Sequence, residues 1–369
     1  MKVLLLSNAK GGVFVFTAEL AKGLADEGCD VHIFFLSEGK MAGSMFNRRV
    51  HLHRLPSLIF GSKSFRQIFH ERPDIIHINF SSYGVLATII KRVFNVPYIY
   101  TIHGLPQPWI EPSLTSKVAY SLEDRFLPYS ALNSSAVISP SNYVKTFLAK
   151  RYGLDSIVIP HGVNLAKFKP KDRTESRKLL GYNNKNRIIL FVGKLHPYKD
   201  PLTLIRAASI ANKDVEDLHV AMIGSGELRR EVEEEIIRLG ISRHFRILSR
   251  ISEEKLRLFY NAADILVFPS INEAFGLVIL EALASGLPVI AANTGACPEI
   301  LGDAGTLFAQ GDPVDLAEKI VELMHDEKSL EGHRVRGRKR VEKYFTWRGV
   351  VEQYFGIYKR VLVNHLQSH

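Results

Sequence analysis

The chain contains little cysteine and no long apolar run. Its only two cysteines, Cys29 and Cys297, lie in opposite halves of 369 residues, so no disulfide framework is implied and a reducing compartment fits best. The first apolar run, residues 3–6, is too short for a signal-peptide core or a membrane span. No other run approaches the roughly 20 residues of a spanning helix. We therefore expect a cytoplasmic protein that is not integral to a membrane.

The dinucleotide-binding fingerprint G-x-G-x-x-G is also missing. Gly11 and Gly12 follow the first predicted strand, where glycine permits close approach of the backbone to a ligand. The segment IGSG at residues 223–226 comes nearer to the motif, but Glu-Leu-Arg follows it and the third glycine is absent. An NAD-dependent oxidoreductase is therefore an alternative and not the leading interpretation.

Positive charge is present in surplus. The chain has 48 Lys+Arg against 38 Asp+Glu, a formal net charge of +10, in a composition of 46% hydrophobic and 23% charged residues that is ordinary for a soluble globular protein. Such a surplus suits an anionic partner: the phosphates of a small molecule, an anionic membrane or nucleic acid. A basic surface that serves solubility alone is the other interpretation.

Short Val/Ile-rich runs alternate with helical periodicity along the whole chain, and the pattern restarts once. This alternation predicts an α/β fold of two doubly wound Rossmann-like domains facing across a ligand-binding cleft. A polar, charged stretch separates the two series, and we place the hinge at residues 163–171. The predicted domains are residues 1–165, completed by a C-terminal helix at 350–369, and residues 166–349.

The most informative segment is NEAFGLVILEALASGLPVIAA at residues 272–292. Glu273 lies where a loop meets a helix, and Glu281 lies about 12 Å further along that helix, so the two carboxylates suit two parts of one extended ligand. A mid-helix glutamate usually faces water, but Glu281 has apolar neighbours, where an unpaired carboxylate is costly. At the helix start we expect free backbone N–H groups that favour a phosphate: those of Ala274, Phe275, Gly276 and Leu277.

These residues resemble the donor-site signature of family 4 glycosyltransferases, which have the two-domain GT-B fold. The similarity covers nearly the whole chain, and its motifs occur in the family's order: Gly11 and Gly12, IPHGVN at 159–164, GKLHPYKD at 193–200, IGSG at 223–226, E-x7-E at Glu273 and Glu281, ALASGLPVIA at 282–291, and Pro298 with Glu299. The resemblance implies a retaining hexosyltransferase that uses a nucleotide-diphosphate sugar and has no nucleic-acid partner.

The resemblance also assigns roles to single residues. Glu281 accepts hydrogen bonds from the ribose, and Glu273 with the amides after it holds the transferred sugar and the adjoining phosphate. Lys194 and Lys199 clamp the diphosphate, where fixed cations stabilise the charge of the leaving group. No D-x-D pair stands in a matching context, so no metal cofactor is expected. The remaining donor-binding candidates are Gly11, Gly12, Gly193, Gly224 and the backbone near Ile251, which matches the segment that contacts the base.

Three positions require comment. The family usually has Arg where this chain has Lys194, which replaces a bidentate fork by a point charge, and it usually has Gly in place of Asp200. His103, at the end of a predicted strand, matches a histidine near the reacting sugar, where it would donate a hydrogen bond or stabilise charge. We predict catalytic roles for His103, Glu273 and Lys199, and a structural role for His161.

The acceptor is not identified by the sequence, but one segment suggests where it comes from. Residues 41–72 contain six Lys+Arg against one acid, Glu71, interleaved with apolar residues. Such a mixture can lie on an anionic bilayer, so we expect a glycan or lipid-linked acceptor and peripheral contact with the inner face of the membrane. A non-catalytic two-lobed sugar-binding protein, and a sugar-phosphate synthase or GT-B phosphorylase, are the remaining alternatives.

Overall fold

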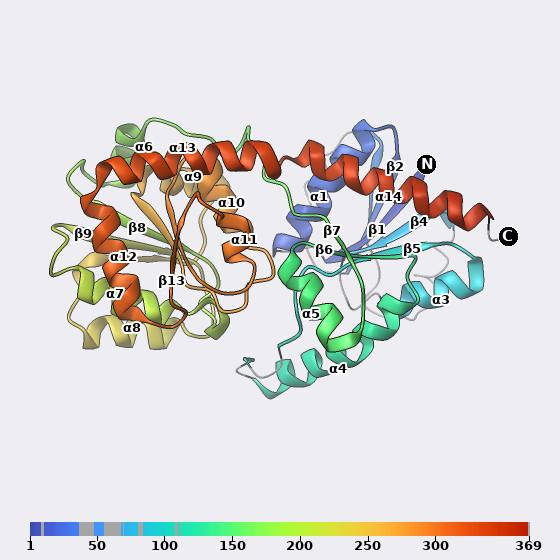
Figure 1. Cartoon of the computed structure of the whole chain (residues 1–369), viewed down its shortest axis with the longest axis horizontal. Coiled ribbons are helices and arrows are strands. Elements are labelled where there is room, and N and C mark those ends of the chain that lie inside the picture. Colours follow the sequence, from blue (N-terminus) through green and yellow to red (C-terminus); the bar gives the residue numbers. More distant parts are fainter. Residues whose placement is uncertain are drawn as a thin grey trace. The chain divides into compact units, whose positions relative to one another are not determined.

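The computed structural model describes residues 1–8, 11–36, 48–54, 68, 70–79, 84–107, 110–111 and 113–367. The chain divides into two compact units (Figure 1). Unit 1 comprises Met1–Gly162 together with Trp347–His369, and unit 2 comprises Val163–Thr346. These divisions lie close to the predicted ones after residues 165 and 349, and the C-terminal helix is part of unit 1.

Unit 1 is built on a seven-stranded sheet in the order β3-β2-β1-β4-β5-β6-β7, with every pairing parallel. Its central strands β1, β4 and β5 are buried on both faces, which is why they read as nearly continuous apolar runs in the sequence. The strands are β1 (Lys2–Asn8), β2 (Asp30–Leu36), β3 (Val50–Arg54), β4 (Ile75–Ile78), β5 (Tyr98–Thr101), β6 (Ala136–Ser139) and β7 (Ile157–Val158). The helices are α1 (Gly11–Asp26), α3 (Gly84–Phe94), α4 (Leu114–Leu132), α5 (Asn142–Tyr152) and α14 (Trp347–Gln367).

Helices α1 and α14 cover one face of the unit 1 sheet. Phe16 and Leu20 of α1 pack with Tyr354 of α14 in one buried apolar cluster. The two helices approach closely at Gly23, where an added Cβ would lie 2.3 Å from Cγ2 of Val351. This packing explains why a helix at the far end of the chain completes the first domain.

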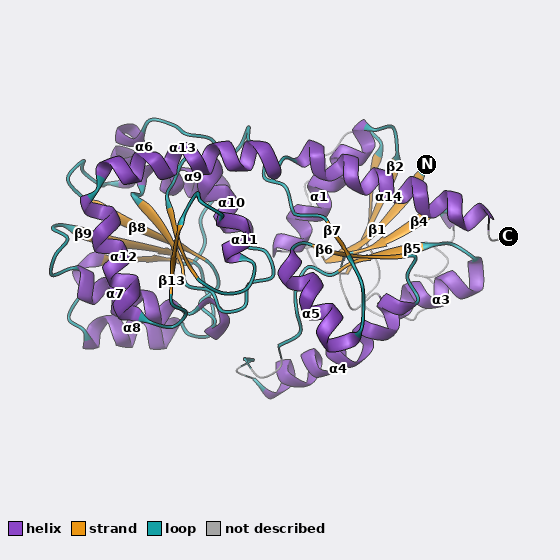
Figure 2. Cartoon of the chain, in the orientation of Figure 1, coloured by secondary structure: helices purple, strands orange, loops and turns teal. Residues whose placement is uncertain are grey.

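Unit 2 has a six-stranded parallel sheet in the order β10-β9-β8-β11-β12-β13. In Figure 1, α7, α8 and α12 lie on one side of this sheet and α6, α9 and α13 on the other, and Figure 2 shows the same elements by type. The strands are β8 (Arg187–Val192), β9 (Leu218–Ile223), β10 (Phe245–Leu248), β11 (Ile265–Phe268), β12 (Val289–Ala292) and β13 (Thr306–Phe308). The helices are α6 (Arg173–Leu180), η3 (Pro197–Lys199), α7 (Pro201–Ala211), α8 (Arg229–Arg238), η4 (Ser242–His244), α9 (Glu253–Ala262), α10 (Leu277–Ala284), α11 (Cys297–Leu301), α12 (Pro313–His325) and α13 (Glu327–Tyr344).

Both sheets have the strand order of a Rossmann fold, which begins in the middle, proceeds to one edge and then returns to fill the other side. The order therefore reverses between β1 and β4 in unit 1 and between β8 and β11 in unit 2. The prediction of two doubly wound α/β domains is confirmed. Among the described residues, no helix is long and apolar enough to cross a membrane.

One buried carboxylate fastens α6 to the unit 2 sheet. Asp264, which is fully buried directly before β11, accepts a hydrogen bond from Ile188 N at 2.7 Å and lies 2.8 Å from Nη2 of Arg177. Arg173 forms a further ion pair with it. A buried charge needs such partners because removing it from water costs several kcal/mol.

Candidate functional site

The loops that follow β8, β9, β11 and β12 meet at the carboxyl edge of the unit 2 sheet. Ligands of open α/β sheets bind at this edge, at the point where the strand order reverses. Backbone hydrogen bonds fasten the loops to one another: Ile271 N donates to the Tyr198 carbonyl at 2.7 Å, and Ala296 N donates to the Glu273 carbonyl at 2.8 Å. The fold therefore brings the predicted donor-binding residues of the 193–200 and 272–281 motifs to one region.

Two glycines permit this close approach. A Cβ at Gly224 would lie 1.7 Å from the Gly193 carbonyl oxygen, and a Cβ at Gly295 would lie 2.5 Å from the Glu273 carbonyl oxygen. Both distances are far below van der Waals contact, so any larger residue would push the loops apart. Gly224, which the resemblance assigns to the donor, thus also serves to bring the β8 and β9 loops together.

Lys199 and Glu273 form an ion pair at the centre of these loops. The Lys199 ammonium contacts Oε2 of Glu273, and the two side chains are only 13% and 17% exposed. The ammonium also lies 4.7 Å from the ring centroid of Phe268 and 5.0 Å from that of Tyr198, and an aromatic face attracts a cation. A cation and a carboxylate are thus held in contact with little water, where charge–charge interactions are stronger than in bulk solvent.

A short 3-10 turn places Lys199. His196 caps η3, because Tyr198 N donates to its Nδ1 at 3.2 Å, while its Nε2 lies 3.0 Å from Oε1 of Glu227. Pro197 supplies a fixed backbone angle at the first position of the turn. The turn ends at Asp200, directly after Lys199.

The family usually has glycine where this chain has Asp200. The structure explains why glycine suits this position and why aspartate is tolerated there. Its φ is +46°, in the left-handed region that favours glycine. Aspartate is tolerated because its carboxylate caps α7: Thr203 donates from Oγ1 at 2.7 Å and from its backbone N at 3.3 Å. Burial raises the pKa of Asp200, and the two Thr203 hydrogen bonds oppose that shift.

Lys194 and Ile251 lie in the same group of loops. Lys194 is exposed and makes no hydrogen bond or ion pair with the part of the chain that the structure describes. It therefore differs from Lys199, whose charge is already paired. Ile251 is half-buried between β10 and Ser252, the residue that caps α9. Gly224 N donates to the Leu248 carbonyl at 2.8 Å, which joins the end of β10 to the β9 loop.

Glu281 lies on α10 and accepts a hydrogen bond from the hydroxyl of Tyr260 at 2.6 Å. Tyr260, on α9, is 1% exposed, whereas Glu281 retains partial exposure. Burial raises the pKa of Glu281 to about 7, and the Tyr260 hydrogen bond acts in the opposite direction. Near neutral pH this side chain can therefore either donate or accept a hydrogen bond.

The start of α10 differs from the prediction. We expected free N–H groups of a helix start at residues 274–277, but α10 begins at Leu277 and residues 274–276 precede it. Gly276 has φ +94° and ends the loop in the left-handed region, so the helix begins only after it. Ala274 and Phe275 are 8% and 3% exposed, and the Phe275 ring lies against Phe345 with a centroid separation of 6.1 Å. Leu277 alone of the four belongs to the first turn.

His103 follows β5 in unit 1 and takes part in a side-chain network. Its Nε2 lies 3.1 Å from Oδ1 of Asn79, its Nδ1 lies 3.1 Å from Nε2 of His161, and the edge of Phe16 contacts its ring. Burial holds the pKa of His103 well below its usual value, with a further contribution from His161. The neutral ring favours hydrogen bonding over the charge-stabilising role that the sequence also allowed. His161 is 4% exposed and its pKa is lowered to about 3 by burial, as suits a structural residue.

Gly11 and Gly12 are the first two residues of α1 and not part of a loop. Gly11 has φ +76°, and no atom of the described residues lies within 4 Å of the position that a Cβ would occupy. The first N–H groups of this helix have no partner within the helix.

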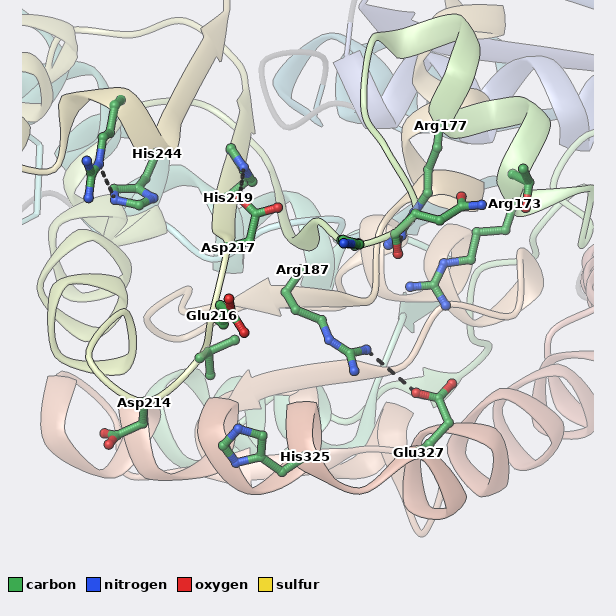
Figure 3. Close-up of a pocket in the computed structure, with 15 residues that line it drawn as sticks. Arg173, Arg177, Arg187, Asp214, Glu216, Asp217, His219, His244, His325 and Glu327 are labelled. Carbon is green, nitrogen blue, oxygen red and sulfur yellow. Dashed lines mark hydrogen bonds and ion pairs between the residues drawn. The ribbon is translucent and has the colours of Figure 1, made fainter.

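A pocket of about 1360 Å³ lies at the opposite, amino edge of the unit 2 sheet (Figure 3). It contains none of the predicted site residues. Two of its cations are paired with carboxylates: Arg177 with Asp264, and Arg187 with Glu327 at 3.6 Å. Because ligands of such sheets bind at the carboxyl edge, size alone does not make this pocket the functional site. Its lining includes Arg173, Arg177, Arg187, Asp217, His219, His244 and Glu327.

Sequence reasoning did not single out three residues that shape this region. His196 and Tyr198 lie inside the quoted motif GKLHPYKD, but their roles depend on a turn that periodicity does not reveal. Tyr260 is separated from Glu281 by a strand and two loops. In the sequence it cannot be distinguished from an ordinary aromatic residue on the buried face of a helix. The one sequence signal for His196 and Tyr198 is that they lie between Lys194 and Lys199.

Two family comparisons cover most of the chain. Residues 172–340 match the family described as Glycosyl transferases group 1, and residues 10–167 match Glycosyltransferase Family 4. A D-inositol 3-phosphate glycosyltransferase 2 from Catenulispora acidiphila is 31% identical over 357 residues, which cover 85% of this chain and 82% of that protein. A D-inositol 3-phosphate glycosyltransferase from Corynebacterium diphtheriae is 27% identical, over 95% of this chain and 90% of its own.

Solved structures with the same fold include two that align along almost the whole chain. A sucrose-phosphate synthase from Thermosynechococcus elongatus has a TM-score of 0.85 at 22% identity, covering 99% of this chain and 100% of its own. HepE from Anabaena, crystallised with UDP and glucose, has a TM-score of 0.85 at 22% identity, covering 98% and 100%. At this level of identity the likeness establishes the GT-B fold.

Proposed function

The chain belongs to the family 4 glycosyltransferases, and from this premise we propose that it transfers a sugar from a nucleotide-diphosphate sugar to an acceptor hydroxyl with retention of anomeric configuration. The observation that carries the proposal is the Lys199–Glu273 ion pair, held with little exposure at the reversal point of the unit 2 sheet. Family membership favours glycosyl transfer over the oxidoreductase and the non-catalytic sugar-binding protein that the sequence left open.

The donor diphosphate is proposed to lie against Lys199 and Lys194. When the bond between the sugar C1 and the phosphate oxygen breaks, the departing nucleoside diphosphate gains negative charge, and a fixed cation stabilises that charge most in a site with little water. Lys199 is such a cation, and Lys194 in the same loop is exposed and able to reach a ligand. We propose that these two lysines perform the charge neutralisation that a divalent metal performs in other enzymes.

Glu273 is proposed to bind hydroxyls of the transferred sugar, and Glu281 the ribose hydroxyls. Glu273 is held by its backbone, because Ala296 N donates to its carbonyl at 2.8 Å, so its carboxylate can exchange Lys199 for a sugar hydroxyl without movement of the loop. The Glu281 carboxyl is oriented by Tyr260. The complex of HepE with UDP and glucose supports a uridine nucleotide as the first donor to test.

The direct test is a thermal-shift screen of UDP-, GDP- and ADP-sugars, followed by an assay of transfer. A ligand present at 100 times its dissociation constant stabilises the folded protein by about 2.7 kcal/mol. We expect one base to be preferred, activity to survive EDTA, and the product to have the anomeric configuration of the donor by NMR. An inverted product would contradict the proposed reaction, and a loss of turnover on chelation that Mg²⁺ or Mn²⁺ restores would contradict the metal-free mechanism.

A second proposal concerns the acceptor, which we infer to be lipid-linked or a glycan reached at an anionic membrane surface. In the predicted basic segment, residues 41–47, 55–67 and 69 lie outside the described residues, and so do Lys63 and Arg66. Arg48, Arg49 and Arg54 are described and exposed. They can contribute about 1 kcal/mol each near an anionic bilayer.

The structure adds an apolar surface in unit 1 that the sequence analysis did not use. Helix α4 exposes apolar side chains at intervals of three or four residues, so they lie along one face of the helix: Leu114 at 77%, Val118 at 53%, Leu122 at 52%, Phe126 at 48% and Tyr129 at 43%. The neighbouring α3 exposes Val93 at 63% and Phe94 at 42%. An apolar stripe of this extent supports contact with a membrane or another protein.

Co-sedimentation with vesicles tests this proposal. Binding should need anionic lipid, weaken as salt rises, and fall both in Arg48→Glu/Arg49→Glu/Arg54→Glu and in Leu122→Glu/Phe126→Glu. Arg230→Glu/Arg348→Glu, which changes two exposed arginines outside these surfaces, is the control and should bind as wild type does. Protein that stays in the supernatant with anionic vesicles at low salt would point to a soluble acceptor.

A further inference from the structure

Three histidines and two carboxylates meet at the β2–β3 edge of the unit 1 sheet. His32 comes from β2, and His51 and His53 come from the edge strand β3. Asp30 begins β2, and Glu71 lies in the chain just before β4. Their nitrogen and oxygen atoms form two overlapping groups of three that share His32, with all atoms of a group within 4.8 Å of one another.

The sequence patterns VHIFF and VHLHR put these side chains on one face. Alternate residues of a strand point to the same side, and the parallel register pairs His32 with His51 and Phe34 with His53. The intervening residues Val31, Ile33 and Val50 point the other way, into the apolar core beneath α1 and α14. The histidine face is therefore opposite that core.

His32 is the most enclosed member, with its side chain 6% exposed, and both of its ring nitrogens face a carboxylate. Its Nδ1 lies 3.2 Å from Oε2 of Glu71 and 2.8 Å from Nε2 of His53. Its Nε2 lies 3.4 Å from Oδ2 of Asp30. A neutral imidazole carries one N–H, so it can donate to only one of the two carboxylates. Burial also lowers the pKa of this ring, which favours the neutral form.

We propose that His32 Nδ1, His53 Nε2 and the Glu71 carboxylate bind one divalent transition-metal ion of the Zn²⁺ class. Two imidazoles and one carboxylate are a ligand set that zinc accepts, at about 2.0–2.2 Å from each donor atom. Tetrahedral geometry at those lengths separates the donors by roughly 3.4 Å. The observed separations of 2.8 and 3.2 Å from His32 Nδ1 need to widen by only a few tenths of an ångström.

Asp30 completes the arrangement. When Nε2–H of His32 donates to Asp30, the lone pair of Nδ1 is directed towards His53 and Glu71, and a carboxylate behind a ligating histidine is the usual partner in metal sites. His51 lies 3.0 Å from the other Asp30 oxygen and so holds that carboxylate in place. Asp30 and His51 are therefore positioning residues and not ligands.

Lys2 competes with the ion. Its Nζ lies 3.5 Å from the Glu71 oxygen and 3.8 Å from Asp30, so in the metal-free protein its ammonium supplies the positive charge between the carboxylates. A bound cation has to share that position. Removal of the Lys2 charge should consequently strengthen metal binding, whereas removal of a ligand should weaken it.

The ion would join three segments that are distant in the sequence: β2, the edge strand β3 and the chain before β4. None of these residues belongs to the proposed donor site. We therefore expect the ion to stabilise the edge of the unit 1 sheet without taking part in glycosyl transfer.

The test is Zn²⁺ binding by tag-free, chelator-treated protein, measured by competition with a chromophoric chelator. Wild type should bind one Zn²⁺ per chain and show a higher melting temperature with the ion. His53→Ala and Glu71→Gln should each weaken binding at least 10-fold, Asp30→Asn should weaken it about 10- to 100-fold, and Lys2→Met should strengthen it. Co²⁺ bound to wild type should give the visible absorption of a four-coordinate ion.

His219→Ala is the matched control, because His219 also lies in a strand and pairs with an aspartate, Asp217, at 3.0 Å, but is not in either group of three. It should bind Zn²⁺ as wild type does. Circular dichroism checks that each variant is folded, and Glu71→Gln keeps the size of the side chain. If His53→Ala and Glu71→Gln bind Zn²⁺ as tightly as His219→Ala, or if wild type binds none at stoichiometric concentration, the proposed site is wrong.

Discussion

The two edges of the unit 2 sheet each contain a carboxylate paired with a cation, but the pairs differ in their exposure and in how many of their hydrogen-bonding groups have partners. At the amino edge, Asp264 is fully enclosed and receives Arg177, Arg173 and a backbone N–H. At the carboxyl edge, Glu273 and Lys199 remain 17% and 13% exposed and have each other. A saturated pair can only stabilise the fold, whereas a pair with unused hydrogen-bonding capacity can exchange a partner for a ligand.

Loss of the amino-edge carboxylate should have the largest effect on stability. Asp264→Ala leaves Arg177 buried without its counter-charge, which costs about 3–5 kcal/mol. Urea denaturation of the purified variant measures this. Glu273→Gln is the control from the other edge and should lose less than about 1 kcal/mol. Similar losses in the two variants would remove the distinction between a structural and an exchangeable pair.

Loss of the carboxyl-edge cation should instead affect turnover. Lys199→Ala should lower kcat by about 10²–10³-fold, the effect of removing one donor that stabilises developing charge, while the free energy of unfolding changes little. Steady-state kinetics with the preferred nucleotide sugar measures this. Lys194→Ala, from the same loop but exposed, should lose less. If Lys199→Ala keeps wild-type kcat, the proposed role of the pair is incorrect.

Glu281 lies between these two cases, because among the described residues its carboxyl has one hydrogen-bond partner, Tyr260, and burial raises its pKa to about 7. A carboxyl whose pKa is raised in the folded state destabilises the fold as pH rises from about 4.5 to about 7, since folding then retains a proton that the unfolded chain releases. Glu281→Gln keeps the Tyr260 hydrogen bond and removes this penalty. Its stability relative to wild type should therefore increase from pH 5 to pH 8, by on the order of 1–3 kcal/mol.

Thermal unfolding at pH 5, 6, 7 and 8 measures that trend, and a difference independent of pH would argue against a raised pKa. A second variant at this position, Glu281→Ala, tests the ribose contact. Free nucleoside diphosphate should bind Glu281→Ala more weakly than wild type, because this contact is present in the ground state as well as in the transition state. Equal affinity would reject the ribose assignment.

The smallest loss of stability is expected for an ion pair at the surface, and this loss is the reference for the other predictions. Glu235 receives hydrogen bonds from Arg238 and Arg206, which lower its pKa to about 2. Its contribution is therefore present above about pH 4.5 and is lost as pH falls towards 2. Because both arginines are mostly exposed, Arg206→Ala should cost only about 0.5 kcal/mol at pH 7. A loss as large as that of Asp264→Ala would contradict the ranking by burial.

The sequence predicted the strands more reliably than the helix starts. The run at residues 3–6 is buried on both faces in the centre of a sheet, so its apolar character follows from its position. Helix α10 starts at Leu277, the last of the four residues whose N–H groups the sequence placed at the helix start, and α1 starts at Gly11, which the sequence placed only after the first strand. A glycine stands at the start of each helix, and its backbone can adopt the angles of a loop or of a helix. Tertiary packing therefore determines where each helix begins.

What the sequence by itself determined is therefore the class of the fold, the family and the motif residues, because strand burial and the E-x7-E segment are local patterns. What only the tertiary structure decided is which charges meet. Lys199 and Glu273 lie 74 positions apart, Arg177 and Asp264 lie 87 apart, and His32, His53 and Glu71 come from three segments. Their contacts depend on the strand order, in which sequence separation does not specify spatial neighbours. Whether a buried charge has all of its partners, and hence whether it stabilises the fold or can bind a ligand, follows from those contacts.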